Sequence, residues 1–267
     1  MMSRQLSQYL QKKTATVITG GSSGIGRCFI THLTTYKPDL WVCNLSRSEP
    51  KDFSKSLNFR HLTCDLADPL TVDRVIPEVI SAVKAAAPEG EILLINNSGF
   101  GSYGVVQQQD PARQLAMVDV NVRSLVALTL ALLPLLQQRG GAIVNIASTA
   151  SFQPTPWMAT YGATKAFVQS WTLGLHEDLR GTQVRALCVC PGPTETAFFG
   201  NSGFGGKKIP GRMSADAVVE ASLQALAADR ALIINGLRNR LTVGLARMVP
   251  VTVAARVARW VLATIRA

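Results

Sequence analysis

This sequence has few histidines, no paired cysteine spacings and no apolar segment near its start. Each of these shortages argues against one class of protein. The 267 residues include three histidines and five cysteines, an odd number. The cysteines show none of the paired spacings typical of zinc sites, so we expect no metal site. The first residues are polar and no apolar segment follows them, which argues against a secretory signal. We therefore expect a cytoplasmic protein with free thiols.

Acidic residues are missing from both ends of the chain. Residues 1–13 hold Arg4, Lys12 and Lys13, and residues 234–267 hold six arginines, with no Asp or Glu in either segment. The residues between them carry 18 basic and 17 acidic side chains, so the formal net charge of +10 belongs almost entirely to the ends. No basic stripe on a nucleic-acid-binding module is recognisable, and we expect no nucleic-acid partner.

Short apolar segments alternate with longer helical ones. The expected strands are 15–19, 40–45, 59–63, 92–96, 142–147, 184–190 and 231–234. The expected helices are 24–36, 69–87, 111–138, 158–180 and 214–228. This order predicts a parallel sheet covered on both faces, hence a single α/β domain with a doubly wound Rossmann fold over residues 14–234. Residues 1–13 would be a basic extension and 235–267 a basic amphipathic helical tail.

A glycine-rich turn lies between the first expected strand and the first helix. Its residues are Gly20, Gly21, Ser22, Ser23, Gly24, Ile25 and Gly26. Glycines allow a tight turn and a close approach of the backbone to a pyrophosphate, and a helix N-terminus offers unpaired N–H groups to the anion. The turn therefore predicts a dinucleotide site.

The second expected strand ends in Ser46 and Arg47, where sites for NAD usually carry an acidic residue that holds the ribose hydroxyls. A guanidinium can instead bind a 2′-phosphate. We therefore predict that NADP(H) is preferred over NAD(H). The alternative is that Arg47 is a solvated loop residue.

Tyr161 and Lys165 lie four residues apart near the start of an expected helix and so share one of its faces. A phenol with a pKa near 10 exchanges protons slowly at neutral pH, and a neighbouring ammonium lowers that pKa. The pair is typical of a general acid and base. Alone, this spacing also occurs by chance on surface helices.

Together with the turn, several further motifs resemble the classical short-chain dehydrogenase/reductase family over residues 14 to 234. They are Asp65, Asn96-Asn97-Ser98-Gly99, Asn121, Ser148, Tyr161-x-x-x-Lys165 and Pro191-Gly192. Residues 148–154 and 163–167 are similar to the bacterial DltE-like subgroup.

The resemblance implies catalytic roles. Tyr161 would donate a proton to a carbonyl oxygen that Ser148 holds, while hydride arrives from the nicotinamide. Lys165 would bind the nicotinamide ribose and lower the pKa of Tyr161, and Asn121 would hold a water that passes protons to Lys165.

It also implies cofactor contacts. Asp65 and Leu66 would contact the adenine, and Asn97 would lie under the cofactor. Thr194 or Thr196 would bind the carboxamide. Ser98 departs from the alanine usual at its position, and cofactor binding should survive that small change.

Two segments leave alternatives open. The Gly-rich loop 192–213 is expected to be a mobile lid, or otherwise an ordinary surface loop. The tail places Leu237, Leu241, Leu245, Met248 and Val249 on one arc and Val253, Val257, Trp260, Val261 and Ile265 on another, beside arginines. Such arcs fit a pocket cover or an oligomer interface, or docking on an anionic membrane.

The sequence thus predicts an NADP(H)-dependent oxidoreductase that acts on a carbonyl or secondary alcohol, with an apolar ketone favoured by nearby aromatic residues. Candidate walls are Phe100, Tyr103, Phe152, Trp157, Phe198 and Phe199. A homo-oligomer is expected, since the helix 111–138 is the usual dimer face of the resembling family, although core packing explains its apolar residues equally well. Two rival functions are a membrane-surface lipid or acyl ketone reductase and a catalytically silent NADP sensor.

Overall fold

All seven predicted strands form one parallel sheet in the computed structural model of the chain, which describes residues 4–50, 58–203 and 211–266. Across the sheet the order is β3-β2-β1-β4-β5-β6-β7. The strands are β1 Lys13–Thr19, β2 Trp41–Ser46, β3 Phe59–Thr63, β4 Glu91–Asn96, β5 Gly141–Ile146, β6 Val184–Cys190 and β7 Leu232–Ile234. In the central register, Val17 of β1 lies beside Cys43 of β2 and Leu94 of β4.

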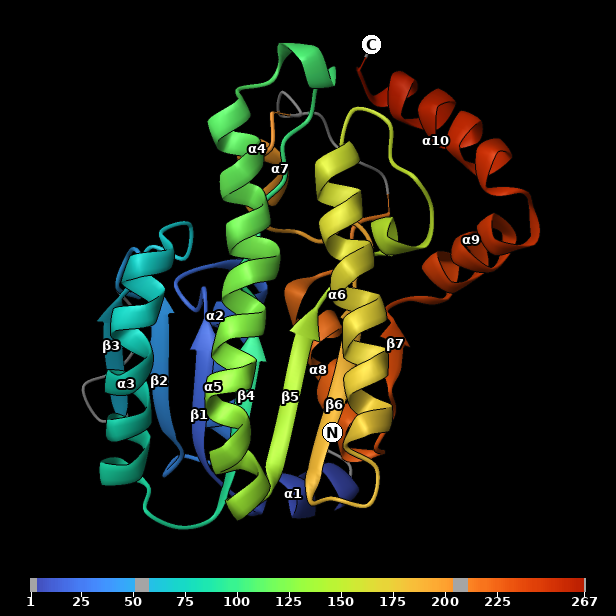
Figure 1. Cartoon of the computed structure of the whole chain (residues 1–267). Helices are drawn as coiled ribbons and strands as arrows, with labels where there is room; N and C mark the ends of the chain where they lie inside the picture. The colour runs from blue at the N-terminus through green and yellow to red at the C-terminus, as the bar shows by residue number, and fades with distance from the viewer. Residues whose placement is uncertain (1–3, 51–57, 204–210, 267) are drawn as a thin grey trace.

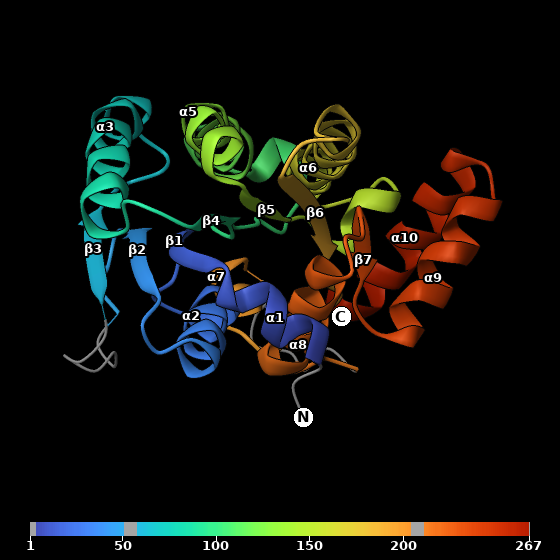
Figure 2. The same ribbon diagram turned by 90° about the horizontal axis from the view of Figure 1, so that it is seen from below.

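Helices cover both faces of this sheet, as expected for a doubly wound fold. Figure 2 shows α3, α5 and α6 on one face and α1, α2 and α8 on the other. The longer helices are α1 Arg4–Gln11, α2 Gly24–Tyr36, α3 Pro69–Ala86, α4 Pro111–Val118, α5 Ser124–Arg139, α6 Ala159–Asp178, α8 Ala215–Ala227, α9 Leu237–Met248 and α10 Val251–Arg266. Short elements are α7 Phe198–Asn201, a π-helical turn Asp119–Arg123, and 3-10 turns Val106–Gln108 and Thr149–Phe152.

The strand order reverses at the centre of the sheet. From β1 the chain passes outward through β2 to β3, and it then returns to β4 on the other side of β1. In open α/β sheets the crevice at such a switch point, outside the carboxyl ends of the strands, is the usual ligand site. Figure 1 shows the carboxyl ends at the top of the sheet, below α4 and α7.

The N-terminal segment is part of the domain, whereas the sequence predicted a mere basic extension. The first described residues form α1, whose Leu6 and Leu10 are buried in the core beneath α2 and α8. Lys13 already belongs to β1 and is buried in an ion pair with Glu91. The short apolar spacing of α1 was hidden within a mostly polar segment.

Two C-terminal helices follow β7, as the tail pattern predicted. They extend beyond the β7 edge of the sheet (Figure 1), and we call α9 and α10 together the C-terminal hairpin. Pro250 lies between them.

By length and composition alone, the stretch Pro111–Arg139 is apolar enough to cross a membrane. Its α5 part is a core helix in this fold, since Leu128, Leu132 and Leu136 pack into the hydrophobic core with α3 and the sheet. Core packing, one of the two explanations left open for this helix, therefore applies to that face of α5.

Candidate active site

The glycine-rich turn joins β1 to α2 and leaves no room for side chains. A Cβ at Gly26 would lie 2.3 Å from the carbonyl oxygen of Gly20, and one at Gly21 would lie 2.4 Å from Ile30. Gly20 and Gly24 have positive φ values of 70° and 55°. This cradle of bare backbone at a helix N-terminus fits a dinucleotide pyrophosphate.

The serines of the turn are available for such a ligand. Ser22 is half-buried and Ser23 is exposed. Ser23 precedes α2 at the N-cap position, but its side chain makes no capping hydrogen bond. The half-buried Ile25 begins to anchor α2 on the core.

Asn97 fastens the turn to the end of β4. Its Nδ2 donates to the carbonyl oxygens of Thr19 and Gly20, at 3.0 and 3.1 Å. The backbone N–H groups of Asn97 and Ser98 both donate to Thr19 Oγ1 at 3.0 Å. Ser98 Oγ lies over Gly20, where it would touch any added Cβ at 2.6 Å. Asn97 thus fixes the floor of the predicted cofactor site.

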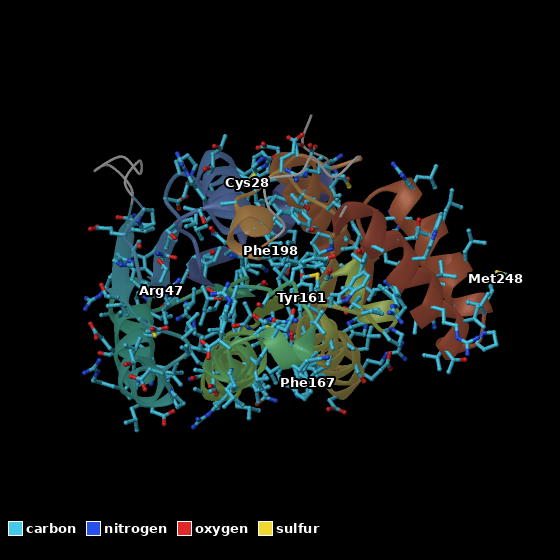
Figure 3. The ribbon with its side chains drawn as sticks, turned by 90° about the horizontal axis from the view of Figure 1, so that it is seen from above. Cys28, Arg47, Tyr161, Phe167, Phe198 and Met248 are labelled. Atoms are coloured by element: carbon cyan, nitrogen blue, oxygen red, sulfur yellow. The ribbon has the colours of Figure 1, made fainter. Side chains whose placement is uncertain are left out.

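Arg47 is exposed at the carboxyl end of β2, and Figure 3 places it well to one side of Tyr161 on the same end of the sheet. Ser46, its neighbour, is buried and committed to the loop. Its hydroxyl accepts from Asn44 Nδ2 at 2.9 Å and donates to the carbonyl of Ser48 at 2.8 Å. Of the two residues predicted to meet a 2′-phosphate, Arg47 is therefore the better placed.

Asp65 and Leu66 follow the end of β3, where Thr63 pairs with Ser46 of β2. Leu66 is buried in the core, and Asp65 accepts from the backbone N–H of Ala67 at 3.0 Å, which shapes the turn. The Asp65 side chain is exposed, so the adenine contact that the resemblance implies for it stays a prediction, whereas the Leu66 side chain faces inward.

Tyr161 opens α6 and lies almost fully buried near Ser148. Ser148 follows β5 and caps the 3-10 turn by accepting from Ala150 N at 3.1 Å. Burial raises the pKa of Tyr161 to about 12, although a hydrogen bond with Ser148 lowers it. The expected lowering of this pKa by Lys165 is therefore not found, because desolvation has the larger effect. The phenol is therefore protonated at neutral pH.

Lys165 lies one turn further along α6, also buried. Its Nζ donates to the carbonyl oxygen of Ile146, the last residue of β5, at 2.7 Å. Desolvation lowers the pKa of Lys165 to about 8. Cys188 and Cys190 lie on one face of β6 with their Sγ atoms 3.7 Å apart. They belong to the packing beside this lysine.

Asn121 lies in the π-helical turn between α4 and α5. Its Oδ1 accepts from Phe100 N at 3.1 Å, and its Nδ2 donates to Phe100 O and Thr164 Oγ1 at 3.0 Å. Gly99 lies between Asn121 and Lys165. A Cβ added at Gly99 would lie 3.0 Å from Lys165 Nζ and 3.1 Å from Asn121 Oδ1. The Nζ and Oδ1 atoms are therefore about 6 Å apart at most, a span that one water can bridge.

The loop after β6 closes the other side of the site. The backbone carbonyl of Pro191 accepts from Thr149 N at 2.9 Å, and Thr194 Oγ1 donates to Gly192 O at 2.9 Å. The methyl group of Thr196 lies 3.1 Å from where a Gly24 Cβ would be. Thr196 thus reaches the glycine turn, and Thr194 is held within its own loop. Residues 204–210 of the predicted lid lie outside the described part of the chain.

Aromatic residues surround Tyr161. We call this packed group the Tyr161 cluster, and it contains Phe100, Tyr103, Met117, Ala150, Met158, Tyr161, Phe198, Phe199 and Leu262. Phe198 of α7 contacts the Tyr161 ring with centroids 5.3 Å apart (Figure 3). Trp157 contacts the cluster through Tyr103, and the centroids of the two rings are 6.1 Å apart. Phe152, also predicted as a wall, packs instead with Trp171 beneath β6.

Two features of the site, and one cluster between α2 and α8, were not predicted from the sequence. Asn44 Oδ1 accepts from Gly21 N at 2.8 Å and so fixes the turn from β2. Leu262 reaches the Tyr161 cluster from α10, and its contact was hidden because its partners are more than 60 residues away. Cys28, His32 and Asp216 also lie together, with Asp216 Oδ1 3.3 Å from Cys28 Sγ and 3.0 Å from His32 Nε2. The Cys28 to His32 spacing on one helix face was the available signal for that last group.

Known proteins are similar to this chain in both sequence and fold. The sequence profile described as short chain dehydrogenase matches residues 14–203. The chain belongs to the short-chain dehydrogenase family. It is thus an NAD(P)-dependent oxidoreductase, as the motifs predicted. The match supports the family as a whole, and the DltE-like subgroup stays a prediction.

Individual relatives and solved structures are similar to this chain. A sulfoacetaldehyde reductase of Chromohalobacter salexigens is 41% identical over 190 residues, which cover 68% of this chain and 72% of that protein. A short-chain dehydrogenase from Sphingobium yanoikuyae, solved with NADPH, has a TM-score of 0.74 at 28% identity and covers 85% of this chain and 90% of its own. Another from Burkholderia phymatum, solved with NAD, has a TM-score of 0.75 at 22% identity, covering 89% and 94%.

Proposed function

We propose that this short-chain dehydrogenase is a carbonyl reductase that uses NADPH and whose proton donor is Tyr161. One observation supports the proposal: the buried Tyr161, Lys165 and Asn121 lie with the half-buried Ser148 beside a bare-backbone dinucleotide cradle. When bound, the reduced nicotinamide supplies the hydride. Ser148 and Tyr161 hold the carbonyl oxygen, and Tyr161 passes its proton to that oxygen as negative charge develops there.

The proton that leaves Tyr161 is replaced through Lys165 and Asn121. Lys165, with a pKa of about 8, is mostly charged at pH 7 and close to the pH at which it exchanges protons. A water between Lys165 Nζ and Asn121 Oδ1 would connect the lysine to the π-helical turn. Single π-helical turns within α-helices are frequent at functional sites.

We infer a preference for NADP(H) from the carboxyl end of β2. Arg47 is exposed there, and the described residues at this strand end include no carboxylate at the position used for ribose hydroxyls. Arg47→Ala should weaken NADPH at least tenfold while NADH changes little. Arg60→Ala on β3, an arginine paired with Glu78, is the matched control and should leave both cofactors unchanged. Equal weakening of NADPH and NADH by Arg47→Ala would contradict the preference.

The substrate proposed is an apolar ketone or the corresponding secondary alcohol. The Tyr161 cluster is aromatic and aliphatic apart from hydroxyl groups, which favours apolar substrates over sugars. The relative named sulfoacetaldehyde reductase supports the reduction of a carbonyl. A panel of ketones with NADPH, with the alcohol product identified, tests this function. Cofactor binding without turnover of any carbonyl would favour the silent sensor, which otherwise has no need of a complete proton relay.

A homo-oligomer is proposed through the face of α4, α5 and α6 that points away from the sheet. Large apolar side chains are exposed there, namely Leu115, Val118, Leu130 and Phe167. The replacement of Leu130 and Phe167 by Glu should reduce the mass measured by sedimentation equilibrium. An unchanged mass would place the contact elsewhere.

We propose a cytoplasmic enzyme, since the five cysteines are all buried free thiols. Peripheral attachment to a membrane is compatible with this location, and one specific observation favours it, the exposed large apolar side chains of the C-terminal hairpin.

A further inference from the structure

Exposed large apolar side chains are concentrated in the C-terminal hairpin. Ten of the sixteen found among the described residues belong to residues 237–261. They are Leu237, Leu241, Leu245, Met248, Val249, Val251, Val253, Val257, Trp260 and Val261. Exposed apolar side chains gathered on neighbouring helices in this way mark a contact with a partner or a membrane.

On α9 the exposed side chains form one stripe that faces away from the domain. Leu237, Leu241, Leu245 and Met248 recur at intervals of three and four residues and thus share a helix face. Val243, which is 3% exposed, lies on the opposite side and anchors α9. Met248 is 82% exposed and stands at the outer edge of the molecule (Figure 3).

α10 has two apolar faces with different surroundings. Ala254 is buried and Leu262 packs into the Tyr161 cluster, where its carbonyl oxygen accepts from Tyr103 Oη at 3.1 Å. Val253, Val257 and Trp260 lie on the other side, and Trp260 is 71% exposed. α10 is therefore a wall with the candidate active site on one side and an uncovered apolar stripe on the other.

The charge of the hairpin indicates what covers these stripes. Residues 234–267 hold six arginines and no acidic residue, and the five whose side chains are described are all exposed. On α9, Arg240 and Arg247 border the stripe by helical projection. On α10, Arg256 and Arg259 lie beside it. Guanidinium groups along an apolar stripe complement anionic headgroups above acyl chains.

A second copy of the chain is a poorer occupant of this surface. A two-fold symmetric contact would bring the same patch of both copies together. Each arginine-rich hairpin would then face another arginine-rich hairpin, with no carboxylate in either to offset the repulsion. The exposed face of α4, α5 and α6, with Leu115, Val118, Leu130 and Phe167, is the alternative surface for self-association.

We propose that the C-terminal hairpin docks this enzyme on an anionic membrane, with its apolar stripes among the acyl chains and its arginines among the headgroups. α10 then lies between the bilayer and the Tyr161 cluster. We further infer that the substrate is a ketone dissolved in that bilayer and that this ketone enters the site past α10. This inference rests on the proposed reductase function.

The docking is tested by vesicle flotation of the full-length protein. Vesicles of phosphatidylcholine alone are compared with vesicles that also contain phosphatidylglycerol. The intact protein should bind the anionic vesicles at least tenfold better, and added salt should weaken binding because surface charges are screened over about 8 Å at physiological ionic strength. Equal binding to both compositions, or none to either, would overturn the proposal.

Two double variants locate the surface. Met248→Gln with Trp260→Gln removes apolar contacts, and Arg247→Gln with Arg256→Gln removes charge. Each arginine near an anionic surface contributes about fivefold to binding, so the second pair should lose about 25-fold.

Matched controls are Leu70→Gln on α3, an apolar residue that is 78% exposed, and Arg180→Gln just after α6. Both controls should bind as the intact protein does. A hairpin variant that binds like the controls would overturn the proposal. A different result would also overturn it: the intact protein binds no vesicle, and a hairpin variant loses self-association. The apolar stripes would then be covered by a second copy of the chain.

The route of the substrate is tested separately by turnover. A long-chain ketone in anionic vesicles and a short water-soluble ketone are compared with NADPH. Met248→Gln with Trp260→Gln should raise the KM for the first about tenfold and leave kcat and the second ketone unchanged. Equal effects on both ketones would overturn the membrane route. Vesicle binding without reduction of any ketone would support docking and contradict the reductase function.

Discussion

Gly26 offers a sharp test of the cofactor cradle, because its lack of a side chain is what allows β1 and α2 to meet. In Gly26→Ala the new Cβ would lie 2.3 Å from the carbonyl oxygen of Gly20 and 2.4 Å from Asn97 Nδ2. The first of these is backbone and cannot swing away, so the turn itself must shift. Such overpacking costs about 1–3 kcal/mol.

The expected result is a lower melting temperature together with weaker cofactor binding. For a domain of roughly this size, each kcal/mol lowers the melting temperature by about 2–4 °C. A shifted turn also misplaces the N–H groups at the start of α2, so the NADPH Kd should rise about tenfold, equivalent to about 1.4 kcal/mol. Differential scanning fluorimetry and NADPH fluorescence titration measure the two effects.

Gly174 provides the matched control. It lies inside α6, and an added Cβ would meet nothing within 4 Å. Gly174→Ala should therefore stabilise the protein by about 0.5–1 kcal/mol and leave NADPH binding unchanged. If Gly26→Ala melted at the wild-type temperature and bound NADPH normally, the close approach of the turn would not be required, and the reasoning would be refuted.

Three further perturbations follow from buried groups. Lys165→Met should stabilise the protein by up to about 3 kcal/mol at pH 7, because burial lowers the pKa of Lys165 to about 8 and so disfavours the charged folded form. Denaturant unfolding should show this gain shrinking as the pH rises from about 8 toward the unfolded value, since the folded lysine is then already neutral; a gain independent of pH would contradict it. Glu91→Gln leaves Lys13 buried without its carboxylate and should cost about 3 kcal/mol in urea unfolding, whereas a cost near zero would show that the ion pair is not needed. Phe198→Ala should lower the pKa of Tyr161 from about 12, because desolvation is the main cause of the raised value. Ultraviolet titration against a Tyr161→Phe background measures this pKa. An unchanged value would show that Phe198 does not shield the phenol.

The strands and the site motifs could be predicted because local signals determine them. Continuous apolar segments such as those of β4 and β6 indicate buried parallel strands, and the glycine turn marks the junction of β1 with α2. Ser148 and Tyr161 belong to a family motif with fixed spacing, so the structure brings them together as expected.

Contacts between distant segments could not be predicted. The role of α1 depends on Leu6 and Leu10 fitting beneath α8, which no local pattern specifies. The packing of Leu262 on the Tyr161 cluster depends on the direction in which α10 leaves α9. The burial of the Ser46 hydroxyl depends on Asn44 and on the loop that follows it. Each of these contacts depends on the tertiary arrangement, which neither hydrophobic periodicity nor a sequence motif specifies.

The central claim, that Tyr161 donates the proton in a carbonyl reduction, is tested most directly by single-turnover oxidation of NADPH in Tyr161→Phe. The substitution removes only the hydroxyl group, so the packing of the ring against Phe198 should remain. The hydride-transfer rate should fall by about 10²–10⁴-fold, the usual contribution of a general acid, while the NADPH Kd stays within about twofold. A rate within tenfold of that of the intact protein would contradict the assignment of Tyr161.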